Sequence, residues 1–230
     1  MKIIGLLGGM SWESSAEYYR VINQGVKQAL GGLHSAKIIL YSVDFAEIEH
    51  FQTTGDWQSA GHILRDAAQR IQGAGADCVL VCTNTMHKVA NQISEGLQIP
   101  LLHIADATAN ALVDQGIKTV GLLGTNFTME QAFYKDRLSE FYGLNVLTPN
   151  QVDRQLIHQV IYQELCLGQV NSNSKAEYLR IIQVLAEQGA EAVILGCTEI
   201  GLLVQQTDTT VKLFDTTALH AQAAIKFALS

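Results

Sequence analysis

The chain has 230 residues, of which 48% are hydrophobic and 16% are charged, a composition typical of a globular protein and not of a disordered one. Its formal net charge of −7 argues against non-specific binding to nucleic acid. The sequence contains no apolar run long enough to span a bilayer and no signal-peptide pattern, so we expect a soluble, cytoplasmic protein with no membrane partner.

Short segments rich in Val, Ile and Leu alternate along the chain with segments of helical periodicity. We expect strands at residues 3–7, 36–43, 78–82, 101–104, 120–123, 192–196 and 211–214. Because these segments are apolar throughout, they indicate strands buried on both faces, as in parallel sheets. Residues 63–71 and 179–186 each place apolar side chains on one helix face, and a capping pattern predicts that the second helix begins at Ser174. This alternation predicts a doubly wound α/β architecture.

The sequence also contains an internal repeat. Residues 5–8 (GLLG) recur as residues 121–124, and residues 75–83 resemble residues 189–197 at nearly the same offset. A duplicated chain predicts two similar parallel-sheet lobes related by a pseudo-twofold axis. Since α/β sheets bind ligands beyond the carboxyl ends of their strands, we expect the active site in the cleft between the lobes. Thr83 and Cys197 occupy equivalent positions and are expected to face each other there.

The four cysteines show no CxxC spacing, so the sequence predicts neither a zinc site nor a disulfide framework. We expect Cys78 and Cys166 to be structural thiols. The turn at Gly8 and Gly9 has neither the dinucleotide-binding nor the P-loop spacing. We expect its backbone to approach a small anionic ligand, with the amides that follow Met10 as donors.

Polar side chains follow two strands at equivalent places in the repeat. Asn84 and Thr85 follow the strand at 78–82, and Thr198 and Glu199 follow the strand at 192–196. Hydroxyl, amide and thiol groups at strand ends are suited to hold a carboxylate or an ammonium group. The alternative is that these residues only cap the following helices.

Residues 8–13 (GGMSWE), 84–87 (NTMH) and 196–199 (GCTE) are similar to the signature segments of the aspartate/glutamate racemases, and the likeness covers essentially the whole chain. The resemblance implies racemisation of aspartate or glutamate without pyridoxal phosphate, metal or any other cofactor, in a homodimer. It implies one lobe of residues 1–97 with 209–230, and a second lobe of residues 98–208. Members of the family use two cysteines, one on each face of the substrate's α-carbon.

The chain departs from this family at one catalytic position, where Thr83 replaces the first cysteine. Cys82 lies one residue earlier, and in a strand that step points a side chain to the opposite face. The resemblance therefore implies that Cys197 is the base for the L-enantiomer and that Thr83, or a water, acts on the other face, favouring conversion of L to D. We expect the substrate to be bound by Met10, Gln52, Asn84, Thr85, His87, Thr125, Thr198 and Glu199.

Several alternatives stay open. His87 and Glu199 can instead be a surface histidine and an exposed charge at a helix start. The segment 45–52 contains no Arg or Lys, so the sequence does not explain how a second carboxylate is bound. The function can be that of a hydantoin racemase or a maleate isomerase. It can also be that of an amino-acid-binding regulatory protein that has lost turnover through Thr83.

Overall fold

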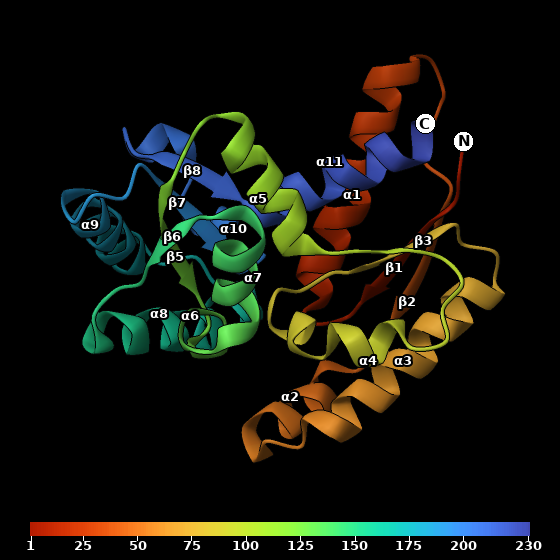
Figure 1. Cartoon of the computed structure of the whole chain (residues 1–230), viewed down its shortest axis with the longest axis horizontal. Coiled ribbons are helices and arrows are strands. Elements are labelled where there is room, and N and C mark those ends of the chain that lie inside the picture. Colours follow the sequence, from red (N-terminus) through yellow and green to blue (C-terminus); the bar gives the residue numbers. More distant parts are fainter. The chain divides into compact units, whose positions relative to one another are not determined.

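The computed structural model describes residues 1–230, which divide into two compact units (Figure 1). The first lobe comprises Met1–Ile104 with His220–Ser230, and the second lobe comprises Ala105–Leu219. Each lobe contains a parallel four-stranded sheet with flanking helices, which confirms the predicted α/β fold class. None of the helices combines the length and the apolarity that a membrane crossing requires.

The sheet of the first lobe has the strand order β2-β1-β3-β4. Its strands are β1 (Ile4–Gly8), β2 (Ile38–Ser42), β3 (Cys78–Val81) and β4 (Leu101–Leu102). The helices around it are α1 (Trp12–Leu30), α2 (Phe45–Thr54), α3 (Trp57–Gly73), the 3-10 helix η1 (Thr85–Val89), α4 (Ala90–Ser94) and the greater part of α11 (Thr216–Leu229).

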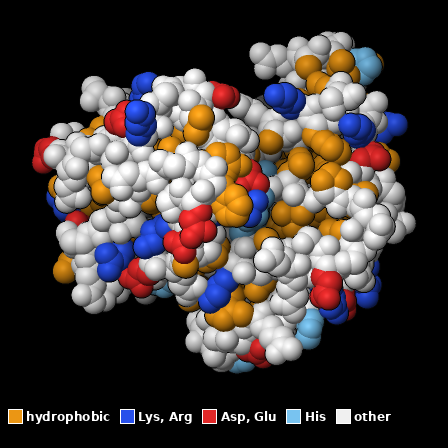
Figure 2. Space-filling view, in the orientation of Figure 1, with side chains coloured by type: hydrophobic (Ala, Val, Ile, Leu, Met, Phe, Trp, Pro, Cys, Tyr) orange, Lys and Arg blue, Asp and Glu red, His pale blue; other side chains and the backbone are white.

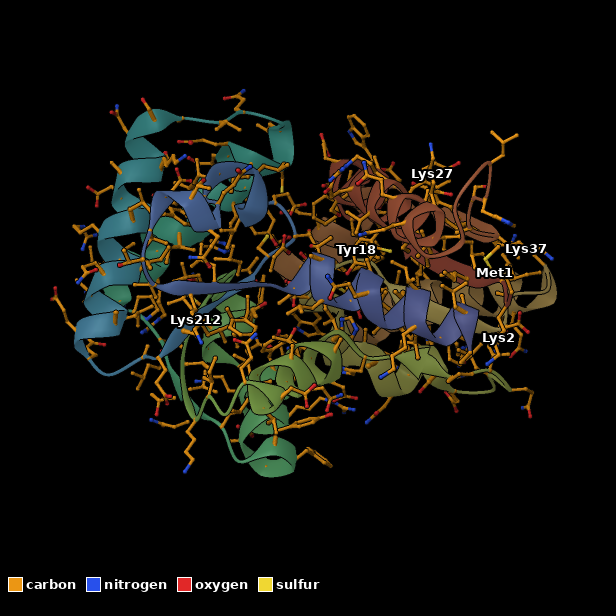
Figure 3. All side chains as sticks on the ribbon, turned by 90° about the horizontal axis from the view of Figure 1, so that it is seen from above. Met1, Lys2, Tyr18, Lys27, Lys37 and Lys212 are labelled. Atoms are coloured by element: carbon orange, nitrogen blue, oxygen red, sulfur yellow. The ribbon has the colours of Figure 1, made fainter.

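Both faces of this sheet are covered. Val79 and Val81 of β3 belong to a hydrophobic core that includes the buried side of α3. Cys78, Leu80 and Cys82 belong to a second core, on the other face, which is covered by α1 and α11. In Figure 3, Tyr18 of α1 lies beside α11. Burial on both faces explains why the strand sequence is apolar throughout.

The sheet of the second lobe has the order β6-β5-β7-β8. Its strands are β5 (Thr119–Gly124), β6 (Asn145–Leu147), β7 (Ala192–Gly196) and β8 (Lys212–Asp215). Its helices are α5 (Ile104–Asp114), α6 (Asn126–Glu130), α7 (Ala132–Tyr142), α8 (Gln151–Gln163), η2 (Leu165–Leu167), α9 (Ser172–Glu187), α10 (Ile200–Leu203) and η3 (Gln206–Asp208).

The structure differs from the sequence-based expectation in four places. The sequence does not predict strand β6. Strand β4 pairs with β3, so it lies in the first lobe, although the expected second lobe begins at residue 98. Strand β8 pairs with β7, so it lies in the second lobe, although residues 209–230 are all expected in the first. Helix α9 begins at Ser172 and not at Ser174, because the side chain of Asn171 caps it by accepting from the backbone N–H of Asn173 at 2.9 Å. Ser174 lies inside the first turn and donates to Glu164.

Candidate active site

Cys197 directly follows β7, beside the end of β5. Gly124 and Gly196 are partners in the parallel ladder, so the turn that begins at Thr125 lies next to Cys197. The two strand ends approach closely, since a Cβ atom on Gly196 would lie 2.7 Å from the carbonyl oxygen of Leu123. Glycine at position 196 is therefore what allows this approach.

The Cys197 thiol forms a buried hydrogen-bonded group with the two residues that follow it. Cys197 Sγ donates to Glu199 Oε2 at 2.9 Å, and Thr198 Oγ1 donates to the same oxygen at 2.7 Å. Glu199 is only 2% exposed. The alternative of an exposed charge at a helix start is therefore wrong for Glu199.

Burial raises the pKa of Cys197 well above that of an ordinary thiol, and the negative charge of Glu199 raises it further. The resting form is therefore the thiol. For Cys197 to act as a base, the thiol must first lose its proton, and the carboxylate that accepts its hydrogen bond is the acceptor in place.

In the first lobe, His87 anchors the turn that contains Thr83. The backbone N–H of Ile104 donates to His87 Nε2 at 3.2 Å, and His87 Nδ1 lies 2.8 Å from the carbonyl oxygen of Thr83. Since Nε2 accepts a hydrogen bond, the ring is neutral and its proton is on Nδ1, which donates to Thr83. His87 is 3% exposed, so the alternative of a surface histidine is wrong.

Cys82 points into the first-lobe core. Its side chain packs with Leu80 and Tyr18, and burial raises the pKa of its thiol. Thr83 is half-buried, while Asn84 and Thr85 are buried at the start of η1. The thiol of Cys82 therefore lies within the core between the sheet and its helices.

Gln52 and Met10 also lie in the first lobe. Both are buried, and Gln52 Nε2 donates to Met86 Sδ at 3.0 Å. The expectation that the glycine turn presents its backbone to an anion is not supported at Gly9. Its N–H donates to Ser15 Oγ at 2.7 Å, and its φ of +93° marks a tight turn that packs against Val43.

Thr125 caps α6, because its hydroxyl accepts from the backbone N–H of Thr128. The second lobe thus brings together Thr125, Cys197, Thr198 and Glu199, and the first lobe brings together Thr83, Asn84, Thr85 and His87. Sequence reasoning missed the neighbouring residues Asn126 and His158, which belong to no recognised motif. The described side chains form no group of three or more His, Cys, Asp or Glu that could hold a metal ion.

Several lysines lie at the amino-terminal ends of strands, opposite to the carboxyl ends that carry the candidate site residues. Lys2, Lys37 and Lys212 precede or begin β1, β2 and β8 (Figure 3). Lys88, in contrast, lies in η1 just after β3, with its Nζ 3.7 Å from the centroid of the Trp57 ring. Burial lowers its pKa. On the face shown in Figure 2, Lys and Arg are interspersed with Asp and Glu on each lobe.

Comparison with known proteins identifies the family. Residues 7–224 match the model of the Asp/Glu/hydantoin racemase family. The chain belongs to this family. The resemblance seen in the sequence is thereby confirmed, and membership of the family supports an amino-acid racemase activity.

Solved structures of other racemase-like proteins resemble this one closely. A Yersinia pestis protein assigned to the Asp/Glu racemases is 57% identical with a TM-score of 0.93, and each chain covers 100% of the other. An aspartate racemase homologue from Pyrococcus horikoshii is 33% identical with a TM-score of 0.86, again over 100% of both chains. A sequence relative, RacX of Bacillus subtilis, is a broad specificity amino-acid racemase. It is 22% identical over 97% of this chain and 96% of its own.

Proposed function

We propose that this racemase interconverts the enantiomers of an acidic amino acid, aspartate or glutamate, without a cofactor. The observation that carries the proposal is the buried Cys197 thiol bonded to the Glu199 carboxylate. A thiol with an adjacent proton acceptor supplies the base that removal of an α-proton requires. We further propose that the protein is a cytoplasmic homodimer.

The reaction begins on the L-enantiomer. Cys197 passes its proton to Glu199, and the thiolate then removes the α-proton and becomes a thiol again. Hydrogen-bond donors around the substrate carboxylate stabilise the carbanion, a role for Asn84, Thr85 and Thr198. Thr83, or a water, returns a proton to the opposite face. The proton held by Glu199 then passes to solvent, and solvent reprotonates the Thr83 alkoxide or the hydroxide. Because the proton added to the α-carbon comes from an exchangeable group, each turnover in heavy water places deuterium there.

The threonine makes the two directions unequal in rate. The Thr83 hydroxyl can donate a proton to a carbanion, but it must be ionised before it can remove an α-proton from the D-enantiomer, and its alkoxide is too basic to be populated at rest. A catalyst leaves the equilibrium between enantiomers unchanged, so kcat/KM is the same in both directions and the preference for L is expressed as a higher kcat at saturating substrate.

Exchange of the α-proton into heavy water tests the proposal. The native protein is expected to exchange the α-proton of L-aspartate or L-glutamate, and folded Cys197→Ser protein is expected to show none. Cys166→Ser and Cys78→Ala, which change thiols outside the proposed chemistry, serve as controls and should retain activity. Substantial exchange by Cys197→Ser would refute the role of this thiol. Binding without any exchange by the native protein would favour an amino-acid-binding regulatory protein.

A further inference from the structure

Asn126 is the first residue after Thr125 in the turn that follows β5. The pairing of Gly124 with Gly196 places this turn next to Cys197 in the same lobe. Asn126 lies two residues after Gly124, the last residue of β5. Gly124 pairs with Gly196, and Gly196 is followed directly by Cys197, the proposed base. Asn126 therefore belongs to the same end of the sheet as Cys197.

Two residues of α8 hold the short helix α6 in place. His158 Nδ1 accepts a hydrogen bond from the backbone N–H of Asn126 at 3.3 Å. Burial lowers the pKa of His158 and so favours the neutral ring, which this hydrogen bond requires. One turn earlier, Arg154 forms an ion pair with Glu130, at the end of α6, at 2.9 Å. The backbone of Asn126 is thus fixed relative to the sheet.

The side-chain oxygen of Asn126 has no donor. Asn126 Oδ1 is buried and receives a hydrogen bond from no donor of the protein. Leaving such an acceptor unpaired destabilises a folded protein. A ligand bound at this end of the sheet could supply the missing N–H.

We propose that Asn126 Oδ1 accepts a hydrogen bond from the α-ammonium group of the substrate. This inference rests on the proposed function and adds the group that selects α-amino acids over acids without an amino group. A neutral amide oxygen attracts N–H donors and repels carboxylates, so neither carboxylate of an acidic substrate can be its partner. The α-ammonium is the donor nearest to the α-carbon at which Cys197 acts.

The test compares two substitutions of Asn126 with one control. Asn126→Leu has a similar size and no acceptor, whereas Asn126→Asp keeps an acceptor oxygen. Gln131→Met is the control. It removes another buried amide oxygen that has no donor, five residues further along the chain in the same lobe. For each protein, KM and kcat are measured with L-aspartate, and Kd is measured by calorimetry for L-aspartate and for succinate, which lacks the amino group.

Asn126→Leu should raise KM and Kd for L-aspartate by about 10- to 100-fold, as expected for a lost hydrogen bond to a charged group, and change kcat little. Its Kd for succinate should be unchanged, so discrimination between the two ligands is lost. Asn126→Asp should still bind L-aspartate, and Gln131→Met should match the native protein. Thermal unfolding without ligand should show that Asn126→Leu is at least as stable as the native protein.

Other results would overturn the inference. An unchanged Kd of folded Asn126→Leu for L-aspartate, or an equal loss of affinity for succinate, excludes a bond to the ammonium group. Loss of L-aspartate binding in Asn126→Asp would show that the side chain faces a carboxylate. Binding of L-aspartate without racemisation by the native protein refutes the proposed function alone, because the binding comparison still tests Asn126. Absence of binding to the native protein refutes both.

Discussion

Replacing Glu199 by Gln tests whether Cys197 gives its proton to this carboxylate. The Cys197 Sγ and Glu199 Oε2 atoms are 2.9 Å apart and buried. Two like unit charges at that distance repel by about 6 kcal/mol at an effective dielectric constant of about 20. A thiolate beside an ionised Glu199 is therefore strongly disfavoured, and the thiolate forms together with a protonated Glu199.

The substitution separates two roles of Glu199 that have opposite consequences. If Glu199 only raises the pKa of Cys197 by its charge, Glu199→Gln lowers that pKa, increases the thiolate fraction at neutral pH and speeds the reaction. If Glu199 accepts the proton, the variant lacks the acceptor. We expect the second result, with the rate of exchange from L-aspartate lowered about 10²- to 10⁴-fold at neutral pH.

Deuterium incorporation at the α-carbon of L-aspartate, followed from neutral to alkaline pH, measures this rate. The residual activity of Glu199→Gln should rise with pH, because its Cys197 thiol has no carboxylate to accept its proton and must lose that proton to solvent, and burial raises the pKa of this thiol. Glu191→Gln is the control, since this exposed carboxylate lies just before β7 and accepts from the backbone of Lys118 and Thr119. A Glu199→Gln protein as fast as the native one at neutral pH would refute the reasoning.

Three further outcomes are expected. Thr83→Cys should raise the initial rate from saturating D-enantiomer by orders of magnitude, and equal initial rates from both enantiomers at saturating concentrations in the native protein would show that another group is the second base. Native activity on L-aspartate should change little from neutral to mildly alkaline pH, because the transfer of the Cys197 proton to Glu199 leaves the number of bound protons unchanged; a steep rise would show that the thiol, whose pKa is raised, must instead lose its proton to solvent. Arg180→Ala should lower the free energy of unfolding, measured by urea denaturation, by about 1–2 kcal/mol, because it leaves the 7%-exposed Asp153 carboxylate without its cation. Arg20→Ala removes one partner of an exposed ion pair and should lower the free energy of unfolding by less than about 1 kcal/mol.

The long central strands were predictable because their side chains are buried on both faces. Strand β7 occupies the predicted residues 192–196, and β3 begins at the predicted Cys78. Strand β6 has three residues, begins with the exposed Asn145 and lies at a sheet edge, so its sequence carries no apolar run. The start of α9 was misplaced because Asn171 and Ser174 are both good capping residues, and only the observed bond to Asn173 distinguishes them.

Motifs indicated the candidate site residues but not their surroundings. Cys197, Thr198 and Glu199 are adjacent in sequence, so their grouping could be predicted. The burial of Glu199 could not, since it depends on the packing around the strand end. The contact between Asn126 and His158 joins residues far apart in the chain, and a single sequence carries no signal for it.

The proposed mechanism assigns unequal chemistry to the two lobes, and the surroundings of Cys197 and Thr83 differ in a way that supports it. In the second lobe, Cys197 has a carboxylate that can take its proton. In the first lobe, the neighbouring titratable group is His87, whose Nδ1 donates to the backbone of Thr83 and whose Nε2 accepts from Ile104. With both ring nitrogens engaged by the backbone, His87 cannot also accept a proton from the Thr83 hydroxyl. Thr83 is therefore held in position but not activated, which suits a group that donates a proton and does not remove one.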